Sequence, residues 1–197
     1  MSSVDRRELI RSLMECRGDG LVVTGLGSPT YDVGACGDDD LNFYLWGAMG
    51  GSAMVGLGIA LAQPDRRVMV VTGDGEILMG IGSLSVIAAQ APTNLTIVVL
   101  DNEGFGETGE QTGLTGRGVD LAAIADASGF RASFSYGETQ EPEGFVERLW
   151  TTPGPVFATV KVPMAPTPIT LVPREGVYVH WRFRQALLGT GTVGEEA

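Results

Sequence analysis

The stretches RVMVVTGDGEILMG, from Arg67 to Gly80, and LTIVVLDNEG, from Leu95 to Gly104, decide the fold of this chain. Each begins with a continuous apolar run, as expected of a strand that is buried on both faces of a parallel sheet. Each run then gives way to polar residues and glycine. A helix is expected between them, from about Glu76 to Gln90. This order of strand, helix and strand is typical of a parallel α/β sheet.

The rest of the chain repeats the alternation. Further strands are expected at 21–24, 42–45, 130–134 and 156–162, and further helices at 3–16, 51–62, 120–128, 143–150 and 177–188. Loops are expected at 31–40, 101–118 and 163–173. We therefore predict an α/β doubly wound parallel sheet with helices on both faces. No linker divides the chain, so residues 1–197 are expected to form a single domain.

Composition excludes several classes of protein. The 24 acidic and 13 basic residues give a net charge of −11, and no basic stripe is present, so no nucleic-acid partner is expected. No apolar run reaches the roughly 20 residues that a bilayer requires, and Met1–Ile10 lacks the apolar core of a signal peptide. We expect a cytoplasmic protein that does not bind membranes. Cys16 and Cys36 with one histidine are too few for a structural zinc site.

The polar residues that follow the two central strands carry the chemistry. Gly73-Asp74-Gly75 follows the first strand, and Asp101-Asn102 follows the second. Glycines where a strand enters a helix let backbone N–H groups approach a phosphate, while carboxylate and amide oxygens suit Mg²⁺. If the strands are neighbours, both polar side chains can reach one ion. Taken alone, Gly73-Asp74-Gly75 is more often merely a tight turn.

Three separated segments carry a resemblance to a known family: Gly73-Asp74-Gly75 with the later Asn102, NFYLWGAMG at Asn42–Gly50, and GFGETGEQ at Gly104–Gln111. In this order and spacing they resemble the diphosphate-binding domain of thiamine diphosphate enzymes. The likeness is strongest to the small β subunits of sulfopyruvate and phosphonopyruvate decarboxylases, and it runs from about Gly20 to Phe130.

The resemblance implies a set of site residues. The Mg²⁺ ligands would be the side chains of Asp74 and Asn102 and the carbonyl of Gly104. The residues implied to contact thiamine diphosphate are Gly47, Ala48, Met49, Gly73, Asp74, Gly75, Glu76, Asn102, Gly104, Phe105 and Gly106. Within that set, Gly47 would accept from the aminopyrimidine amine through its carbonyl. Met49 would lie beneath the cofactor and bend it, although ordinary core packing is the alternative for a methionine.

The resemblance also implies an activity and a partner. Its members decarboxylate 2-oxo acids with thiamine diphosphate and Mg²⁺, and the glutamate that activates the cofactor comes from a pyrimidine-binding domain. This chain resembles only the diphosphate-binding domain, so we expect a separate α subunit and a hetero-oligomer. The apolar segment 51–62 would suit packing against that subunit or an ordinary core. The alternatives are a carboligase or lyase subunit on the same cofactor, and a non-catalytic scaffold that binds it.

Two glutamates depart from the family pattern. Glu76 stands where a small hydroxyl residue is common, and its charge would repel a diphosphate unless the side chain turns outward. Glu107 stands where serine is frequent. It is a candidate for proton transfer or for disfavouring an anionic substrate tail, with a solvent-facing loop position as the alternative. His180 is expected to be packed or exposed rather than catalytic, on an aromatic docking helix at about 177–188.

Overall fold

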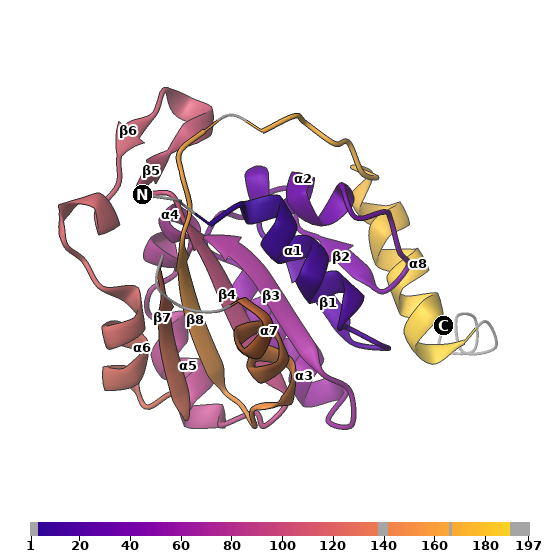
Figure 1. Ribbon diagram of the computed structural model, residues 1–197. Helices are drawn as coiled ribbons and strands as arrows, with labels where there is room; N and C mark the ends of the chain where they lie inside the picture. The colour runs from indigo at the N-terminus through magenta and orange to yellow at the C-terminus, as the bar shows by residue number, and fades with distance from the viewer. Residues whose placement is uncertain (1–3, 138–141, 166, 190–197) are drawn as a thin grey trace.

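The computed structural model describes residues 4–137, 142–165 and 167–189. At its centre is a six-stranded parallel sheet in the order β2-β1-β3-β4-β8-β7 (Figure 1). Its strands are β1 (Leu21–Thr24), β2 (Asn42–Tyr44), β3 (Val68–Gly73), β4 (Leu95–Asp101), β7 (Ala132–Tyr136) and β8 (Val156–Lys161). The chain runs outward from β1 to β2 and then returns to β3 on the other side of β1. This reversal is the kind of switch point beside which ligands bind in open parallel sheets.

Helices cover both faces of the sheet, which confirms the predicted fold class. One face carries α1 (Arg6–Glu15), α2 (Ser28–Gly34) and α7 (Pro142–Thr151). The other carries α3 (Ser52–Ala62), α4 (Asp74–Met79), α5 (Ser83–Gln90) and α6 (Leu121–Ser128). Side chains that alternate along the strands fill the two cores: Val22, Met69 and Val98 pack on the first face, and Val23, Val70 and Ile97 on the second. Strands buried on both faces explain the continuous apolar runs.

Two predicted segments were wrong in part. Residues 31–40 were expected to be a loop, which holds for 35–40, but 31–34 belong to α2; this helix begins at Ser28, with Pro29 in its first turn, where the missing N–H of proline costs nothing. The helix predicted from Glu76 to Gln90 is two helices, α4 and α5, separated at 80–82, and Gly80 at this break lies against the backbone of Gly50. A Cβ at Gly80 would lie 2.2 Å from the carbonyl oxygen of Gly50.

The long loop at 101–118 has its own order. It contains a two-stranded antiparallel hairpin, β5 (Gly104–Phe105) and β6 (Gln111–Thr112), and the 3-10 turns η1 (Gly106–Thr108) and η2 (Thr115–Arg117). The strand expected at 130–134 lies two residues later, as β7. Figure 1 shows the hairpin beyond the carboxyl ends of the strands.

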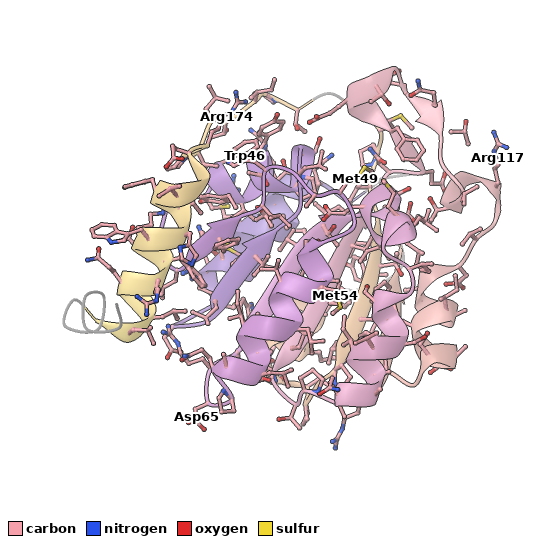
Figure 2. The ribbon with its side chains drawn as sticks, turned by 180° about the vertical axis from the view of Figure 1, so that it is seen from behind. Trp46, Met49, Met54, Asp65, Arg117 and Arg174 are labelled. Carbon is pink, nitrogen blue, oxygen red and sulfur yellow. The ribbon has the colours of Figure 1, made fainter. Side chains whose placement is uncertain are left out.

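The last helix, α8 (Gly176–Leu188), packs against the edge strand β2. The connector that leads to it from β8 passes over the carboxyl end of the sheet (Figure 1). Trp46 binds the end of this connector that adjoins α8. Its indole Nε1 donates to the carbonyl of Pro173 at 2.7 Å, and the Arg174 guanidinium lies 4.9 Å from the centre of the indole ring (Figure 2). Among the described residues, no helix has the length and apolar character needed to cross a membrane.

Candidate functional site

The sheet brings the two polar strand ends to one edge. Strands β3 and β4 are hydrogen-bonded neighbours, with Gly73 opposite Leu100. Asp74 therefore follows β3 beside the start of the Asp101–Gly104 turn that follows β4. On the other side of β3, strand β1 ends in the loop that leads into α2. The condition set by the sequence, that the two strands be neighbours, is met.

A cavity of about 280 Å³ opens at this edge, and we call it the cleft. It is lined by most of the residues that the resemblance implied: Met49, Gly73, Asp74, Gly75, Glu76, Asn102, Gly104, Phe105, Gly106 and Glu107. Gly47 and Ala48 are not among its lining residues; they are exposed in the turn before Met49, where Ala48 has a φ of +52°. Figure 2 shows Met49 toward the carboxyl edge of the sheet, at the end of the face that α3 covers.

Asp74 is the most buried acid of the cleft, with 2 % of its surface exposed. The hydroxyl of Thr115 donates to its Oδ2 at 2.8 Å. Burial raises the pKa of Asp74 above the usual 3.8; the Thr115 hydrogen bond opposes this shift, and the nearby charge of Asp101 adds to it. A carboxylate held in this way gains stability from a bound cation.

At the end of β4, the acid and the amide are arranged differently. Asp101 is buried and pairs with the Nζ of Lys161 at 2.8 Å, and Glu103 binds the same ammonium at 2.6 Å. Asn102 is half-buried in the cleft, and its Oδ1 accepts from the N–H of Gly104 at 3.2 Å. Lys161 thus compensates Asp101, while Asp74 and Asn102 line the cleft with oxygen atoms.

The wall of the cleft is apolar and closely packed at Gly75. A Cβ on Gly75 would lie 2.6 Å from the ring of Phe105 and 3.4 Å from the methyl group of Met49, so glycine is required there. Among the described residues, Met49 belongs to neither of the two core clusters. Its position on the cleft wall argues against ordinary core packing.

Glu76 turns inward and lines the cleft, so the outward orientation that would remove its repulsion of a diphosphate is not the one observed. It is buried, and its carboxylate accepts from the N–H of Leu26 at 3.2 Å and from the N–H of Ser52 at 3.3 Å. Gly25 makes the room, because a Cβ there would lie 1.8 Å from Oε2 of Glu76. The carboxylate therefore joins the loop after β1 to the first residue of α3, with its charge engaged by two backbone donors.

Glu107 is both exposed and part of the cleft wall. A Cβ added at Gly27 would lie 2.7 Å from its Oε1, so the side chain reaches across the opening to the loop after β1. Glu107 therefore faces both solvent and the cleft, so each of the two positions expected from the sequence is partly correct. His180 is exposed on α8, far along the chain from any residue that lines the cleft.

Sequence reasoning missed two parts of the cleft. The segment from Leu26 to Pro29, where the loop after β1 enters α2, and the side chain of Arg6 both line it. The turn Gly25–Gly27 at the end of β1 was a usable signal, since β1 adjoins β3 and polar turns at neighbouring strand ends meet. Arg6 had no local signal, because it reaches the cleft from a helix on one face of the sheet.

The chemistry of the donors fits a hard divalent cation and a phosphate. One carboxylate, one amide oxygen and the backbone carbonyls of the β4 turn are oxygen ligands of the type that Mg²⁺ takes, and Gly73 and Gly75, which line the cavity where β3 meets α4, leave the backbone there accessible to an anion. Among the described residues, no group of three or more His, Cys, Asp or Glu side chains could hold a metal ion. The oxygen donors of the cleft differ from such a group, because they include one carboxylate, with an amide and backbone carbonyls as the other ligands.

Comparison with known proteins identifies relatives. The model of the family "Thiamine pyrophosphate enzyme, C-terminal TPP binding domain" matches residues 36–160. The sulfopyruvate decarboxylase subunit beta of Methanothermobacter thermautotrophicus is 34 % identical over 186 residues, which cover 94 % of this chain and 97 % of that protein. The phosphonopyruvate decarboxylase of Streptomyces hygroscopicus is 38 % identical over 180 residues, which cover 90 % of this chain and 44 % of that protein.

Solved structures show the same fold. The benzoylformate decarboxylase of Polynucleobacter necessarius matches 86 % of this chain and 35 % of its own, with a TM-score of 0.72 and 19 % identity. A thiamin diphosphate-dependent enzyme from Mycobacterium smegmatis matches 82 % of this chain and 32 % of its own, with a TM-score of 0.69 and 22 % identity. The chain thus spans about a third of these larger proteins and nearly all of the archaeal beta subunit.

Proposed function

Since this chain belongs to the thiamine pyrophosphate enzyme family as a C-terminal TPP binding domain, we propose that it is the beta subunit of a two-chain, Mg²⁺-dependent 2-oxo acid decarboxylase. The observation that carries the proposal is the meeting of Asp74, Gly75 and Asn102 in one cavity at the carboxyl ends of β3 and β4. Full-length coverage of a sulfopyruvate decarboxylase beta subunit supports the assignment to that type of enzyme.

In this proposal the cleft holds the diphosphate end of the cofactor. Asp74 and Asn102 contribute side-chain oxygens to Mg²⁺, and Gly104 contributes its carbonyl. Backbone groups of Gly73, Gly75 and Glu76 bind the phosphoryl oxygens. Burial of Asp74 and its hydrogen bond from Thr115 support this role, because they fix the carboxylate before the ion arrives.

The remaining residues orient the organic part of the cofactor. Met49 and Phe105 form the apolar wall beside Gly75, and their contact there supports a role for Met49 in bending the cofactor. Gly47 and Ala48, exposed just before Met49, are proposed to meet the aminopyrimidine at the boundary with a partner subunit. When bound, the cofactor supplies an electron sink for the loss of CO₂ from a 2-oxo acid. Glu107, at the cleft opening, is proposed to hold or move a proton near the substrate.

A separate alpha subunit is proposed to supply the activating glutamate; the words "subunit beta" in the name of the Methanothermobacter relative support the existence of such a partner. The outer side of α3 supports such an interface. Met54 and Leu61 are 41 % and 50 % exposed, and Gly58 lies between them on the same side of the helix. Figure 2 shows Met54 on the outer surface of the molecule at this helix. An apolar helix surface of this kind is expected to be covered in an assembly.

The test is a decarboxylation assay on this chain co-purified with the chain encoded beside it. We expect CO₂ release from sulfopyruvate or a simpler 2-oxo acid only when both chains, thiamine diphosphate and Mg²⁺ are present. An acceptor aldehyde in a parallel reaction detects carboligation by its product. Cofactor binding without turnover of any 2-oxo acid would contradict the decarboxylase proposal and favour a scaffold. Glu76 is one of the two sequence features that favour that scaffold; the two backbone N–H groups that donate to its carboxylate offset its charge and support the catalytic alternative instead.

The role of Glu107 has its own test. The Glu107→Ser variant is expected to change the relative kcat/KM for 2-oxo acids with and without an anionic tail, and to leave the affinity for the cofactor nearly unchanged. Equal effects on substrate preference and on cofactor affinity would contradict a role at the substrate.

A further inference from the structure

Arg6 is the charged residue of the cleft that the roles above leave without a purpose. It lies in the first turn of α1 and is 5 % exposed. It lines the cleft and also a second cavity of about 420 Å³ that adjoins it. Ser28, Asn102, Gly106 and Glu107 line both cavities too. Arg6 therefore lies where the two cavities meet, beside the proposed magnesium ligand Asn102.

Asp32 holds the Arg6 guanidinium by one nitrogen. The Nε of Arg6 donates to Oδ2 of Asp32 at 2.5 Å, and the Nε of Arg7 donates to Oδ1 of the same carboxylate at 3.2 Å. Asp32 is fully buried on α2. Two guanidinium groups around one carboxylate leave a net positive charge in this cluster.

The terminal nitrogens of Arg6 are free for a ligand. Within the described part of the chain, neither has a hydrogen-bond partner, and neither is among the fully enclosed polar atoms that lack one. Their remaining surface therefore opens on the cavities that the residue lines. A cation with unused donors in a site that is nine-tenths buried is costly unless an anion completes it.

Charge in the cleft points to the identity of that anion. Of the described residues that line the two cavities, only Arg6 carries a positive charge, while Asp74, Glu76, Glu107 and Glu110 are acidic. A fully ionised diphosphate ester carries more negative charge than a single Mg²⁺ ion neutralises. The planar guanidinium, with its donors in a fixed fork, matches phosphoryl oxygens in geometry as well as in charge.

We propose that the free edge of Arg6 binds a phosphoryl group of the cofactor's diphosphate, with the hydroxyl of Ser28 beside it. In this arrangement Asp32 is a positioning residue, because it orients the guanidinium without facing the ligand itself. The inference rests on the proposed function, since it assigns a further ligand-binding residue to the same cleft. It adds α1, a helix from the opposite side of the sheet to α3 and α4, to the cofactor site.

The test compares two neighbouring arginines in the two-chain complex. Calorimetric titration with thiamine diphosphate, and separately with inorganic pyrophosphate, is done with Mg²⁺ present. Arg6→Gln is expected to weaken both ligands by about ten-fold or more, the loss of one or two charge-assisted hydrogen bonds. Arg7→Gln is the matched control: Arg7 binds the same Asp32 but lines neither cavity, so affinity is expected to stay at the wild-type value.

Equal affinities of wild type, Arg6→Gln and Arg7→Gln would overturn the inference while leaving the proposed function intact. A raised KM for the 2-oxo acid with unchanged cofactor affinity would also overturn it, because the charge would then serve the substrate. Failure of the wild-type complex to bind either probe would contradict the proposed function itself. If Arg6→Gln does not fold, Arg6→Lys replaces it. A single ammonium cannot reproduce the fork between Asp32 and a phosphoryl group, so wild-type affinity in Arg6→Lys would be equally contradictory.

Discussion

Two buried arginines at opposite ends of the chain have different surroundings. Arg182 of α8 uses both terminal nitrogens on Asp38, at 2.6 and 2.8 Å, and closes α8 onto the sheet edge. Arg6 of α1 uses only Nε, on Asp32, and leaves its terminal nitrogens to the cavities. Both residues are more than nine-tenths buried. Burial of a charge alone therefore does not distinguish the two arginines; only Arg6 combines unused terminal donors with a position beside the cavities, which is the basis of the role that we propose for it.

Asp38 and Asp74 differ in the same way as the two arginines. Burial alone would raise the pKa of Asp38, but hydrogen bonds from Arg182 and Tyr44 outweigh it and hold the pKa below the usual 3.8. Burial raises the pKa of Asp74, although the hydroxyl of Thr115 and the backbone N–H groups of Gly75 and Asp74 donate to the side chain. Asp38 is paired with a cation of its own chain, whereas Asp74 has no such partner among the described residues, in keeping with the cation that we propose for the cleft.

The largest expected effect is at Asp74. Asp74→Ala should weaken Mg²⁺-dependent binding of thiamine diphosphate by at least about 100-fold, the upper end of what loss of an outer partner of a metal ligand costs. Thr115→Val removes only the hydrogen bond that orients Asp74 and should cost about ten-fold. Calorimetry on the two-chain complex measures both. An order reversed between the two variants would contradict Asp74 as the metal ligand.

Substitution of Arg182, at the edge of the sheet, should lower the stability of the protein and leave cofactor binding unchanged. Arg182→Met removes two hydrogen bonds to a carboxylate and should lower the free energy of unfolding by about 2 kcal/mol, without changing cofactor affinity. Chemical denaturation monitored by circular dichroism measures the loss. Arg184→Met, at a half-buried position on the same helix, is the control and should be near neutral. A cofactor defect in Arg182→Met would break the contrast between the two arginines.

Glu76 tests whether an acid in the cleft is structural. Glu76→Gln leaves one backbone N–H, of Leu26 or Ser52, without its acceptor, so the free energy of unfolding should fall by about 1–2 kcal/mol. Glu107→Gln is the control, because Glu107 is exposed and the same change should leave stability within about 0.5 kcal/mol. Thermal and denaturant unfolding compare the two. Tighter cofactor binding in Glu76→Gln would instead mean that its charge acts mainly by repulsion.

The smallest expected effect concerns pH. The pKa of Asp38 is lower in the folded protein than its ordinary value of 3.8, so its stabilising contribution is present above about pH 4 and is lost as pH falls through the folded value. Asp38→Asn should therefore reduce the acid destabilisation of the wild type below pH 4, and should leave the pH dependence unchanged near neutrality. Denaturant midpoints measured from about pH 2.5 to 7 detect this. Parallel curves for both proteins would be inconsistent with the ion pair.

Local pattern was sufficient to predict the strands β3 and β4 and the turns that follow them, because buried parallel strands are continuous in apolar residues and end in polar groups at one edge. Side-chain directions could not be predicted in this way. The carboxylate of Glu76 depends on N–H groups 24 and 50 residues away in the chain. Arg6 reaches the cleft because a partner 26 residues later orients it. Such contacts exist only after the sheet has brought distant loops together.

The measurement that bears most directly on the central claim is calorimetric titration of thiamine diphosphate into the wild-type two-chain complex, with excess Mg²⁺ and again with a chelator in its place. We predict saturable binding with Mg²⁺ and a loss of at least about ten-fold in affinity without it, because Asp74 and Asn102 then face the diphosphate with no cation between them. The same affinity under both conditions, or no binding under either, would contradict the assignment of the cleft to a Mg²⁺-bound diphosphate.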